Sequence, residues 1–331
     1  MSLTQGYQMR RLSMLAPLVF LLASPLLAGP AYTDPQKTDA DFAYQGEYAG
    51  TVSAEGEETK VGVQVIALGK GKFRAVGYVG GLPGDGWDQS KDKVQVDGEL
   101  KDGQIVFAKD EGQGIVKDGK ITLMHGEREL GQLDKVERKS PTLGAKPPAG
   151  AVVLFDGSSA DAFEGGKISD DKLLIQGCRS KQKFASHKVH VEFRTPYQPE
   201  DNQQGRGNSG TYLQGRFEVQ ILDSFGLNGE DNECGGIYKI SKPSVNMAMP
   251  PLTWQTYDLE FTAAKYDGEK LVENARITVY HNGVKIHDNV DLGTKETTAA
   301  PVPAGPTPGP LYLQDHGNPV RFRNVWIVET K

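Results

Sequence analysis

Cysteine is scarce in this 331-residue chain, which carries only Cys178 and Cys234. Two thiols are too few for a disulfide-rich scaffold or for a four-cysteine zinc site. Two alternatives stay open for the pair: one disulfide bond in an oxidising compartment, or two small buried side chains.

The chain also lacks an excess of charge of one sign. Its 37 basic and 43 acidic residues give a net charge of −6, and no basic run or RNA-binding signature occurs. We therefore expect no nucleic-acid partner, since binding to phosphate backbones needs clustered positive charge.

The N-terminal stretch 12–33 has no charged residue, follows two adjacent arginines and ends in small residues. This pattern is typical of a secretory signal peptide, and two prolines within the stretch argue against a stable membrane span. We expect a signal peptide over residues 1–31, cleaved near Ala28 or Ala31, and a periplasmic or secreted protein. The two arginines also leave a twin-arginine export signal open.

Long segments with helical periodicity are missing, and short alternating runs broken by Gly and Asp-Gly occupy residues 32–139. Such runs predict strands, and Asp102-Gly103 and Asp118-Gly119 predict tight hairpin turns. The sequence therefore predicts a small all-β domain at 32–139, to which it assigns no function. The Pro- and Gly-rich segment 140–150 predicts a linker. Residues 151–331 again read as many short strands, which favours a sandwich, jelly roll or barrel.

The segment 207–223 separates into two faces by residue parity. On a strand, Phe217, Val219 and Ile221 would enter a core while Glu218 and Gln220 share the opposite surface. A loop of three residues, Gln214 to Arg216, keeps polar residues opposite polar ones, because it pairs Tyr212 with Glu218. The expected polar face is Asn208, Tyr212, Glu218 and Gln220.

Paired acids do not occur on that face. A two-carboxylate glycosidase needs two acids about 5 to 9.5 Å apart. Glu218 and Asp223 are an odd number apart, so they point to opposite faces unless the strand bends after Leu222. An exposed strand carboxylate is the alternative interpretation of Glu218.

A second polar concentration follows at 314–324. His316 at a strand end is a candidate proton donor, and Arg321 or Arg323 could stabilise an anion. The alternative is a turn histidine bonded to Asp315 beside solvated arginines.

Two further groups of residues are candidate metal ligands. His187 and His190 should diverge from a strand to the surface, which makes a metal pair improbable. The acidic loop 228–233 could hold calcium, but it lacks the spacing of an EF-hand, which favours a solvated loop.

Six motifs occur in a fixed order between Asn208 and Asn324: Asn208-Ser209-Gly210, Glu218 to Asp223, Gly236-Ile237-Tyr238, Trp254 to Tyr257, His281 to Val284, and Leu313 to Gly317 with Val320 to Asn324. Together they resemble the 3-keto-disaccharide hydrolase domain family, over about residues 151–331. The resemblance implies a concanavalin A-like jelly roll of two packed sheets, often in exported proteins, with activity on 3-keto sugars. In two places the chain departs from the family: Phe163 stands where a tryptophan is expected, and the region around Cys178 to Ser180 is diverged.

A ketone at C3 of a sugar acidifies the hydrogen at C2, so that one base suffices to eliminate the glycosidic oxygen before water adds. Such an elimination would account for the missing acid pair. We expect Glu218 as the base and His316 as the acid. The expected substrate-binding residues are Asn208, Tyr212, Gln220, Asp223, Tyr238, Gln314 and Arg321.

No metal ligand and no cofactor is expected, with calcium or another divalent ion left open. The alternatives are a non-catalytic, lectin-like carbohydrate-binding protein, since fold does not settle function, and a glucanase on unoxidised polysaccharide, which Gln220 counts against. The oligomeric state is not assigned.

Overall fold

A computed structural model describes residues 29–54, 56–87, 89–91 and 93–330. Within them the regular secondary structure is almost all strand, apart from three short 3₁₀ helices: η1 (Pro35–Lys37), η2 (Ala40–Ala43) and η3 (Gln203–Gly205). The predicted all-β class is confirmed. No helix in these ranges is long and apolar enough to cross a membrane. Most of the predicted signal peptide, residues 1–28, falls outside the described residues.

The first part of the chain is a closed barrel of eight antiparallel strands in the order β1-β10-β9-β8-β7-β6-β3-β2. Its strands are β1 (Gly46–Ala54), β2 (Glu57–Gly69), β3 (Lys72–Val79), β6 (Lys93–Lys101), β7 (Gln104–Lys109), β8 (Gly112–Lys117), β9 (Lys120–His125) and β10 (Arg128–Val136). The residues of both predicted Asp-Gly turns have the positive φ that this turn needs, 52° and 75° at Asp102 and Gly103 and 49° and 75° at Asp118 and Gly119. The small pair β4 (Leu82–Pro83) and β5 (Gly86–Trp87) lies in the glycine-rich connection after β3.

The second part is a sandwich of two antiparallel sheets. The larger sheet has the order β11-β24-β15-β18-β21-β22, with β13 also paired to β24. Its strands are β11 (Val152–Phe155), β13 (Leu174–Ile175), β15 (His187–Arg194), β18 (Gln255–Thr262), β21 (Arg276–His281), β22 (Val284–Asp291) and β24 (Arg321–Glu329). The smaller sheet has the order β12-β14-β23-β16-β17, from β12 (Phe163–Glu164), β14 (Cys178–Phe184), β16 (Ser209–Leu213), β17 (Phe217–Ile221) and β23 (Gly309–Leu313). β19 (Lys265–Asp267) and β20 (Lys270–Glu273) form a separate hairpin.

One apolar core fills the space between the two sheets. Phe193, Phe322 and Tyr257 of the larger sheet lie in the same buried cluster as Leu213 and Val219 of the smaller one. Alternate residues of each strand therefore face this core, and the residues between them face outward.

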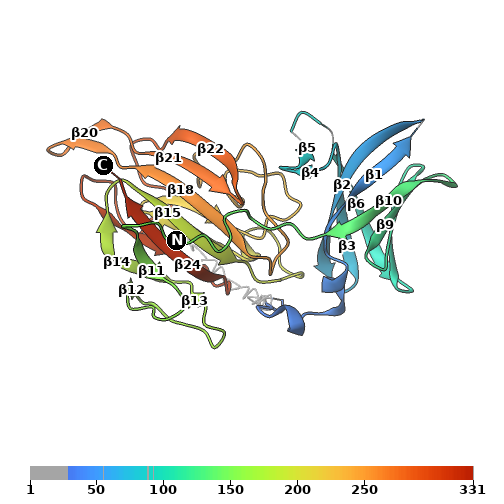
Figure 1. The fold of residues 1–331 in the computed structure, drawn as a ribbon, viewed down its shortest axis with the longest axis horizontal. Coiled ribbons are helices and arrows are strands. Elements are labelled where there is room, and N and C mark those ends of the chain that lie inside the picture. Colours follow the sequence, from blue (N-terminus) through green and yellow to red (C-terminus); the bar gives the residue numbers. More distant parts are fainter. Residues whose placement is uncertain (1–28, 55, 88, 92, 331) are drawn as a thin grey trace, which may run out of the picture.

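The segment 137–151, which we call the strap, runs from the barrel to the sandwich (Figure 1). It is no free linker, because it binds the outer face of the larger sheet. Thr142 Oγ1 donates to Asp258 Oδ2 at 2.6 Å, and the Gly144 N–H donates to Glu192 Oε1 at 2.6 Å. Polar side chains on that face thus satisfy the backbone of a segment whose composition alone predicts flexibility.

Barrel and sandwich contact each other through apolar and polar groups. Tyr197 and Leu252 of the sandwich belong to the buried cluster of the barrel, and Phe225 packs with Ile66 and Val76. The loops that follow β15 and β17 therefore lie against the barrel.

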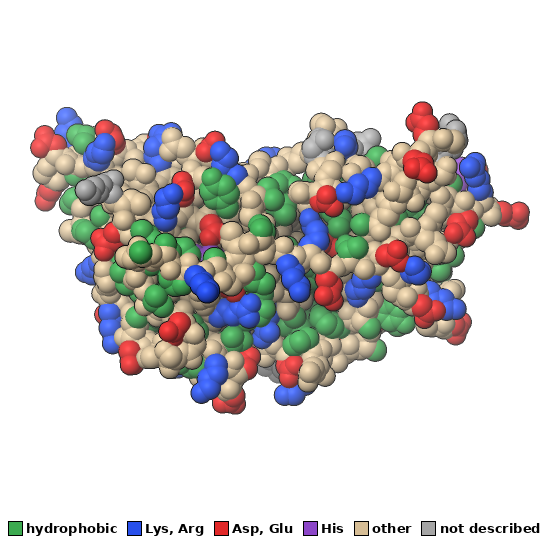
Figure 2. Space-filling view, viewed as in Figure 1, with side chains coloured by type: hydrophobic (Ala, Val, Ile, Leu, Met, Phe, Trp, Pro, Cys, Tyr) green, Lys and Arg blue, Asp and Glu red, His purple; other side chains and the backbone are tan. Residues whose placement is uncertain are grey.

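Acidic and basic side chains are interspersed over the face of the molecule shown in Figure 2.

Candidate active site

The predicted hairpin is present with the predicted register. Tyr212 lies opposite Glu218 and Leu213 opposite Phe217, which leaves a three-residue loop. Gly215 has a φ of 65° in that loop. Phe217, Val219 and Ile221 belong to the sandwich core, so Glu218 points to the outer face of the smaller sheet.

Glu218 is buried on that face, with only 3% of its surface exposed, so it is not the exposed carboxylate of the alternative interpretation. Burial raises the pKa of its carboxyl group to about 7, against the opposing effect of a hydrogen bond from Tyr212. Gln314 Nε2 in turn donates to the Tyr212 hydroxyl at 2.9 Å. The amide, the phenol and the carboxyl thus form a chain that orients Glu218 and leaves it able to gain or lose a proton near neutral pH.

Gly210 provides the space for the Glu218 carboxyl. Gly210 is on β16, where it pairs with Gln220 of β17 and shares a face with Tyr212. A Cβ atom added at this position would lie 2.2 Å from Glu218 Oε1. The glycine of the Asn208-Ser209-Gly210 motif therefore lets the carboxyl group lie over its backbone, and a larger residue would displace that group.

Three amide oxygens on the same face are buried without a hydrogen-bond partner among the described residues: Asn208 Oδ1, Gln220 Oε1 and Gln314 Oε1. The amide nitrogens of these residues are engaged. Asn208 Nδ2 donates to Gln204 O at 2.8 Å, and Gln220 Nε2 donates to Gln204 Oε1 at 3.0 Å. Buried acceptors without donors are costly, so this face is set up to receive hydroxyl groups.

A pocket of about 540 Å³ adjoins this face where the sandwich meets the barrel. Gln204 and Asn232, which both contact Gln220, line it together with Arg206. Ile66 and Leu68 of β2 form part of the opposite wall, so the barrel contributes to the pocket. Its volume is that of a typical small-molecule site, and such sites favour domain junctions.

Comparison with known families identifies the sandwich. Residues 150–328 match the family described as 3-keto-alpha-glucoside-1,2-lyase-like domain. The chain belongs to this family. The match covers more than half of the chain and confirms the resemblance found in the sequence, while the barrel lies outside it.

Solved structures of similar proteins come from Parabacteroides distasonis, and each is named as a candidate glycosyl hydrolase. One is 33% identical with a TM-score of 0.50, over 55% of this chain and 85% of the other. Two others are 18% and 20% identical, with TM-scores of 0.40 and 0.39; they cover 55% and 54% of this chain and 94% and 99% of their own. Among curated proteins, none matches the chain.

Asp223 does not join Glu218 in the lyase-like domain. Its Oδ2 atom accepts a hydrogen bond from Arg206 Nε at 2.6 Å, in an ion pair that is almost fully buried. Both residues line the pocket between sandwich and barrel described above, which we call the junction pocket. The bend that would pair Asp223 with Glu218 is therefore not used for that purpose. Glu164, on the same face but at the far edge of the smaller sheet, forms an ion pair with Arg179. Among the described residues no acid contributes to the pKa of Glu218, so a close acidic partner is missing there.

Tyr238 lies beside β17, and His316 lies in the turn that follows β23. The Tyr238 N–H donates to the Glu218 carbonyl oxygen at 3.1 Å, which places Tyr238 beside β17 with its side chain half-buried. His316 is exposed in the turn after β23, two residues beyond Gln314. Asp315 accepts from the Gly317 N–H at 2.9 Å, and no hydrogen bond joins it to His316 within the described chain.

Arg321, predicted as a substrate-binding residue, does not lie beside Glu218. Arg321 is on β24 of the larger sheet, next to Phe322, which faces the core. Its side chain therefore lies on the outer face of the opposite sheet, where Nη1 donates to Gln176 Oε1 at 3.0 Å. The sandwich core separates it from Glu218.

The two histidines expected at the surface are buried instead. His187 faces the core beside Phe261, while His190 faces the strap and its Nδ1 atom lies 2.6 Å from Asp258 Oδ1. Their side chains diverge, as predicted for residues three apart on a strand.

Within the described residues no group of three or more His, Cys, Asp or Glu side chains could hold a metal ion. In the acidic loop, Glu233 accepts the backbone N–H groups of Gly229 and Glu230 instead. Cys178 and Cys234 are both buried free thiols, so the structure selects the second of the two alternatives for the pair.

Sequence reasoning missed Gly210, Gln204 and Arg206. A glycine within a strand pattern could have indicated a close approach at position 210. Gln204 and Arg206 lie in or beside η3, in a loop without periodicity, and nothing in the sequence connects them to the hairpin.

Proposed function

We propose that this protein cleaves the glycosidic bond of 3-keto-glycosides by elimination, with Glu218 as the general base. One observation carries the proposal: a single buried carboxyl group with a pKa near 7 lies among unpartnered amide oxygens, and no other acid of the described residues contributes to that pKa. Membership of the lyase-like family and the similarity to candidate glycosyl hydrolases support a reaction at a glycosidic bond.

The proposed reaction begins with the hydrogen at C2, which the neighbouring C3 ketone acidifies. The Glu218 carboxylate takes this proton, and the C2–H electron pair forms the enolate. As the enolate collapses, a C1=C2 double bond forms, the bond from C1 to the glycosidic oxygen breaks, and that oxygen takes a proton from an acid. Water then adds across the double bond. Because a base works best with a pKa near the working pH, the raised pKa of Glu218 suits the first step.

His316 is the proposed acid for the departing oxygen. It is exposed in the turn two residues beyond Gln314, and its exposure lets it exchange protons with solvent. The unpartnered oxygens of Asn208, Gln220 and Gln314 are proposed to accept hydroxyl groups of the keto sugar. Tyr238 is proposed as a platform for a sugar ring.

The junction pocket is proposed to hold the rest of the substrate. Arg206 Nη2 is buried there without a hydrogen-bond partner among the described residues, so it can donate to a sugar oxygen. Asp223 holds the guanidinium group of Arg206 through the ion pair. Its proposed role is therefore to position Arg206, and it does not act on the glycosidic bond.

The test is to incubate the purified protein with a 3-keto-glucoside or 3-keto-trehalose and, in parallel, with the unoxidised sugar. The proposal predicts cleavage of the keto sugar alone and a loss of at least about 100-fold in kcat for Glu218→Gln, the usual contribution of a general base. Glu269→Gln, at an exposed hairpin position, is the matched control and should retain full activity. Binding of both sugars without cleavage would indicate a lectin-like protein, and cleavage of the unoxidised sugar would exclude the keto-dependent step.

The proposed reaction uses only groups of the protein, without a metal ion or a cofactor. Activity should therefore survive EDTA. A loss of activity in EDTA that calcium or another divalent ion restores would contradict this part of the proposal. We also propose export, supported by the signal-peptide pattern of residues 1–31. Cell fractionation followed by N-terminal sequencing tests it, and an uncleaved cytoplasmic product would contradict it.

A further inference from the structure

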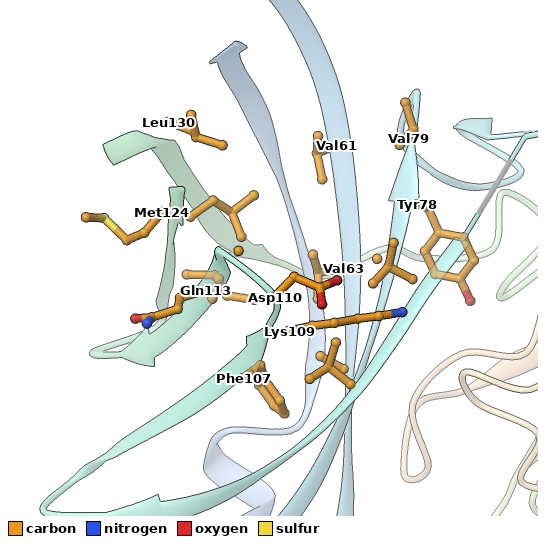
Figure 3. Close-up of a pocket in the computed structure, with 18 residues that line it drawn as sticks. Val61, Val63, Tyr78, Val79, Phe107, Lys109, Asp110, Gln113, Met124 and Leu130 are labelled. Carbon is orange, nitrogen blue, oxygen red and sulfur yellow. The ribbon is translucent and has the colours of Figure 1, made fainter. Parts of the chain in front are cut away.

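The barrel contains a cavity of about 490 Å³, which we call the barrel cavity. Apolar side chains from strands around the barrel line it, among them Val61, Val63, Val96, Phe107, Leu123 and Leu130 (Figure 3). An eight-stranded barrel is just wide enough either to be filled by its own side chains or to hold one small ligand. The lining and volume of this cavity correspond to the second case.

Two glycines keep the barrel cavity open. A Cβ atom added at Gly77 on β3 would meet nothing closer than Val94 O at 3.8 Å, and one at Gly114 on β8 would meet only side-chain atoms of Leu123 and Ile121, at 3.5 and 3.6 Å. Neither glycine has a positive φ. Backbone geometry therefore does not require glycine at these positions, and their effect is to leave space inside the barrel.

One part of the barrel interior is closed and another is accessible. Tyr48, Phe73 and Ile105 are fully buried, in the same cluster as Tyr197 of the sandwich. By contrast, Val79, which borders the barrel cavity, keeps 49% of its surface exposed. A molecule could thus enter from solvent without separating the two domains.

We propose that the barrel cavity binds one small, mostly apolar molecule with a single uncharged polar end. An apolar cavity of ~150 Å³ accommodates benzene, so the barrel cavity should hold a molecule of roughly 15 to 20 non-hydrogen atoms. Lys109, Asp110 and Gln113 also border it, among the apolar side chains of Figure 3. The charges of Lys109 and Asp110 are opposite and Gln113 is neutral, so together they favour a hydroxyl, carbonyl or aryl amine group over an ion.

This binding site is independent of the Glu218 site. Its lining comes entirely from the barrel, outside the lyase-like family match at 150–328, and it shares no residue with the junction pocket. The failure of one proposal therefore leaves the other intact.

The experiment is a fluorescence titration of the purified protein with N-phenyl-1-naphthylamine, a neutral aromatic probe of suitable size. We expect saturable binding of one probe per chain. Gly77→Leu, which fills the barrel cavity, should weaken binding by at least about tenfold, because it removes apolar surface that the probe would bury. Gln95→Leu adds the same side chain at an exposed position between Val94 and Val96, which border the cavity, and should bind like the wild type.

Gly114→Leu is the second filling variant, in case Gly77→Leu does not fold, and cooperative thermal unfolding shows which variants are folded. The proposal is overturned if the wild type shows no saturable binding. It is equally overturned if a folded filling variant and Gln95→Leu bind the probe as tightly as the wild type.

Discussion

The raised pKa of Glu218 should be visible in the pH dependence of stability. Its carboxyl group has an ordinary value of 4.5 and a pKa of about 7 in the folded protein. Between these two values the folded state holds a proton that the unfolded state has released, so stability falls as the pH rises through this window. The difference between these two pKa values corresponds to about 3 kcal/mol of stability.

Glu218→Gln should remove this part of the pH dependence. The amide keeps the size of the carboxyl group and can still accept the hydrogen bond from Tyr212, but it does not ionise. We therefore expect the variant to be more stable than the wild type by about 3 kcal/mol at pH 8.5, and the difference to shrink as the pH falls toward 4.5.

Urea unfolding at closely spaced pH values between 4.5 and 8.5 measures this difference directly. Other titrating groups are common to both proteins and cancel when the two curves are subtracted. Glu269→Gln, the exposed control, should run parallel to the wild type. Parallel curves for Glu218→Gln and the wild type would refute the assignment of a raised pKa to Glu218.

Three further predictions concern the same region. Tyr212→Phe removes the hydrogen bond that lowers the pKa of Glu218. The midpoint of the pH profile of kcat/KM, expected near 7 in the wild type, should therefore move to higher pH. An unchanged midpoint would contradict the contact between Tyr212 and Glu218. Gly210→Ala should push the carboxyl aside and lower kcat at least about tenfold with little change in KM, measured by steady-state kinetics. Arg206→Met should lower stability to urea by about 3 kcal/mol because it leaves the Asp223 carboxylate buried and unpaired, and adding Asp223→Leu should recover most of the loss; no recovery would show that the ion pair is not the cause.

The strands and the hairpin could be predicted because local rules govern them. Parity fixed the faces of β17, and the demand that Tyr212 oppose Glu218 fixed the loop length. Parity fails for Arg321 because it assigns a face within one strand but not the sheet to which the strand belongs. The turn that precedes β24 carries the chain from the smaller sheet to the larger one, and this change leaves no periodic pattern in the sequence.

Tertiary contacts decided what the sequence missed. The strap looks like a linker by composition, yet Glu192 and Asp258 bind it and bury His190 beneath it. The depth of burial that raises the pKa of Glu218 depends on Tyr212, Gly210 and the segment around Tyr238, which come together only in the folded sandwich. A strand pattern places the carboxyl group on one face of the sheet but does not show how far the rest of the fold buries that face from solvent.

The reaction of a 3-keto-glucoside in deuterium oxide tests the central claim most directly. Elimination followed by addition of water should place deuterium at C2 of the released keto sugar, above the level of an enzyme-free control, and Glu218→Gln should abolish both release and labelling. Release of the sugar at the wild-type rate with hydrogen retained at C2, or full activity in Glu218→Gln, would contradict Glu218 as the base of an elimination.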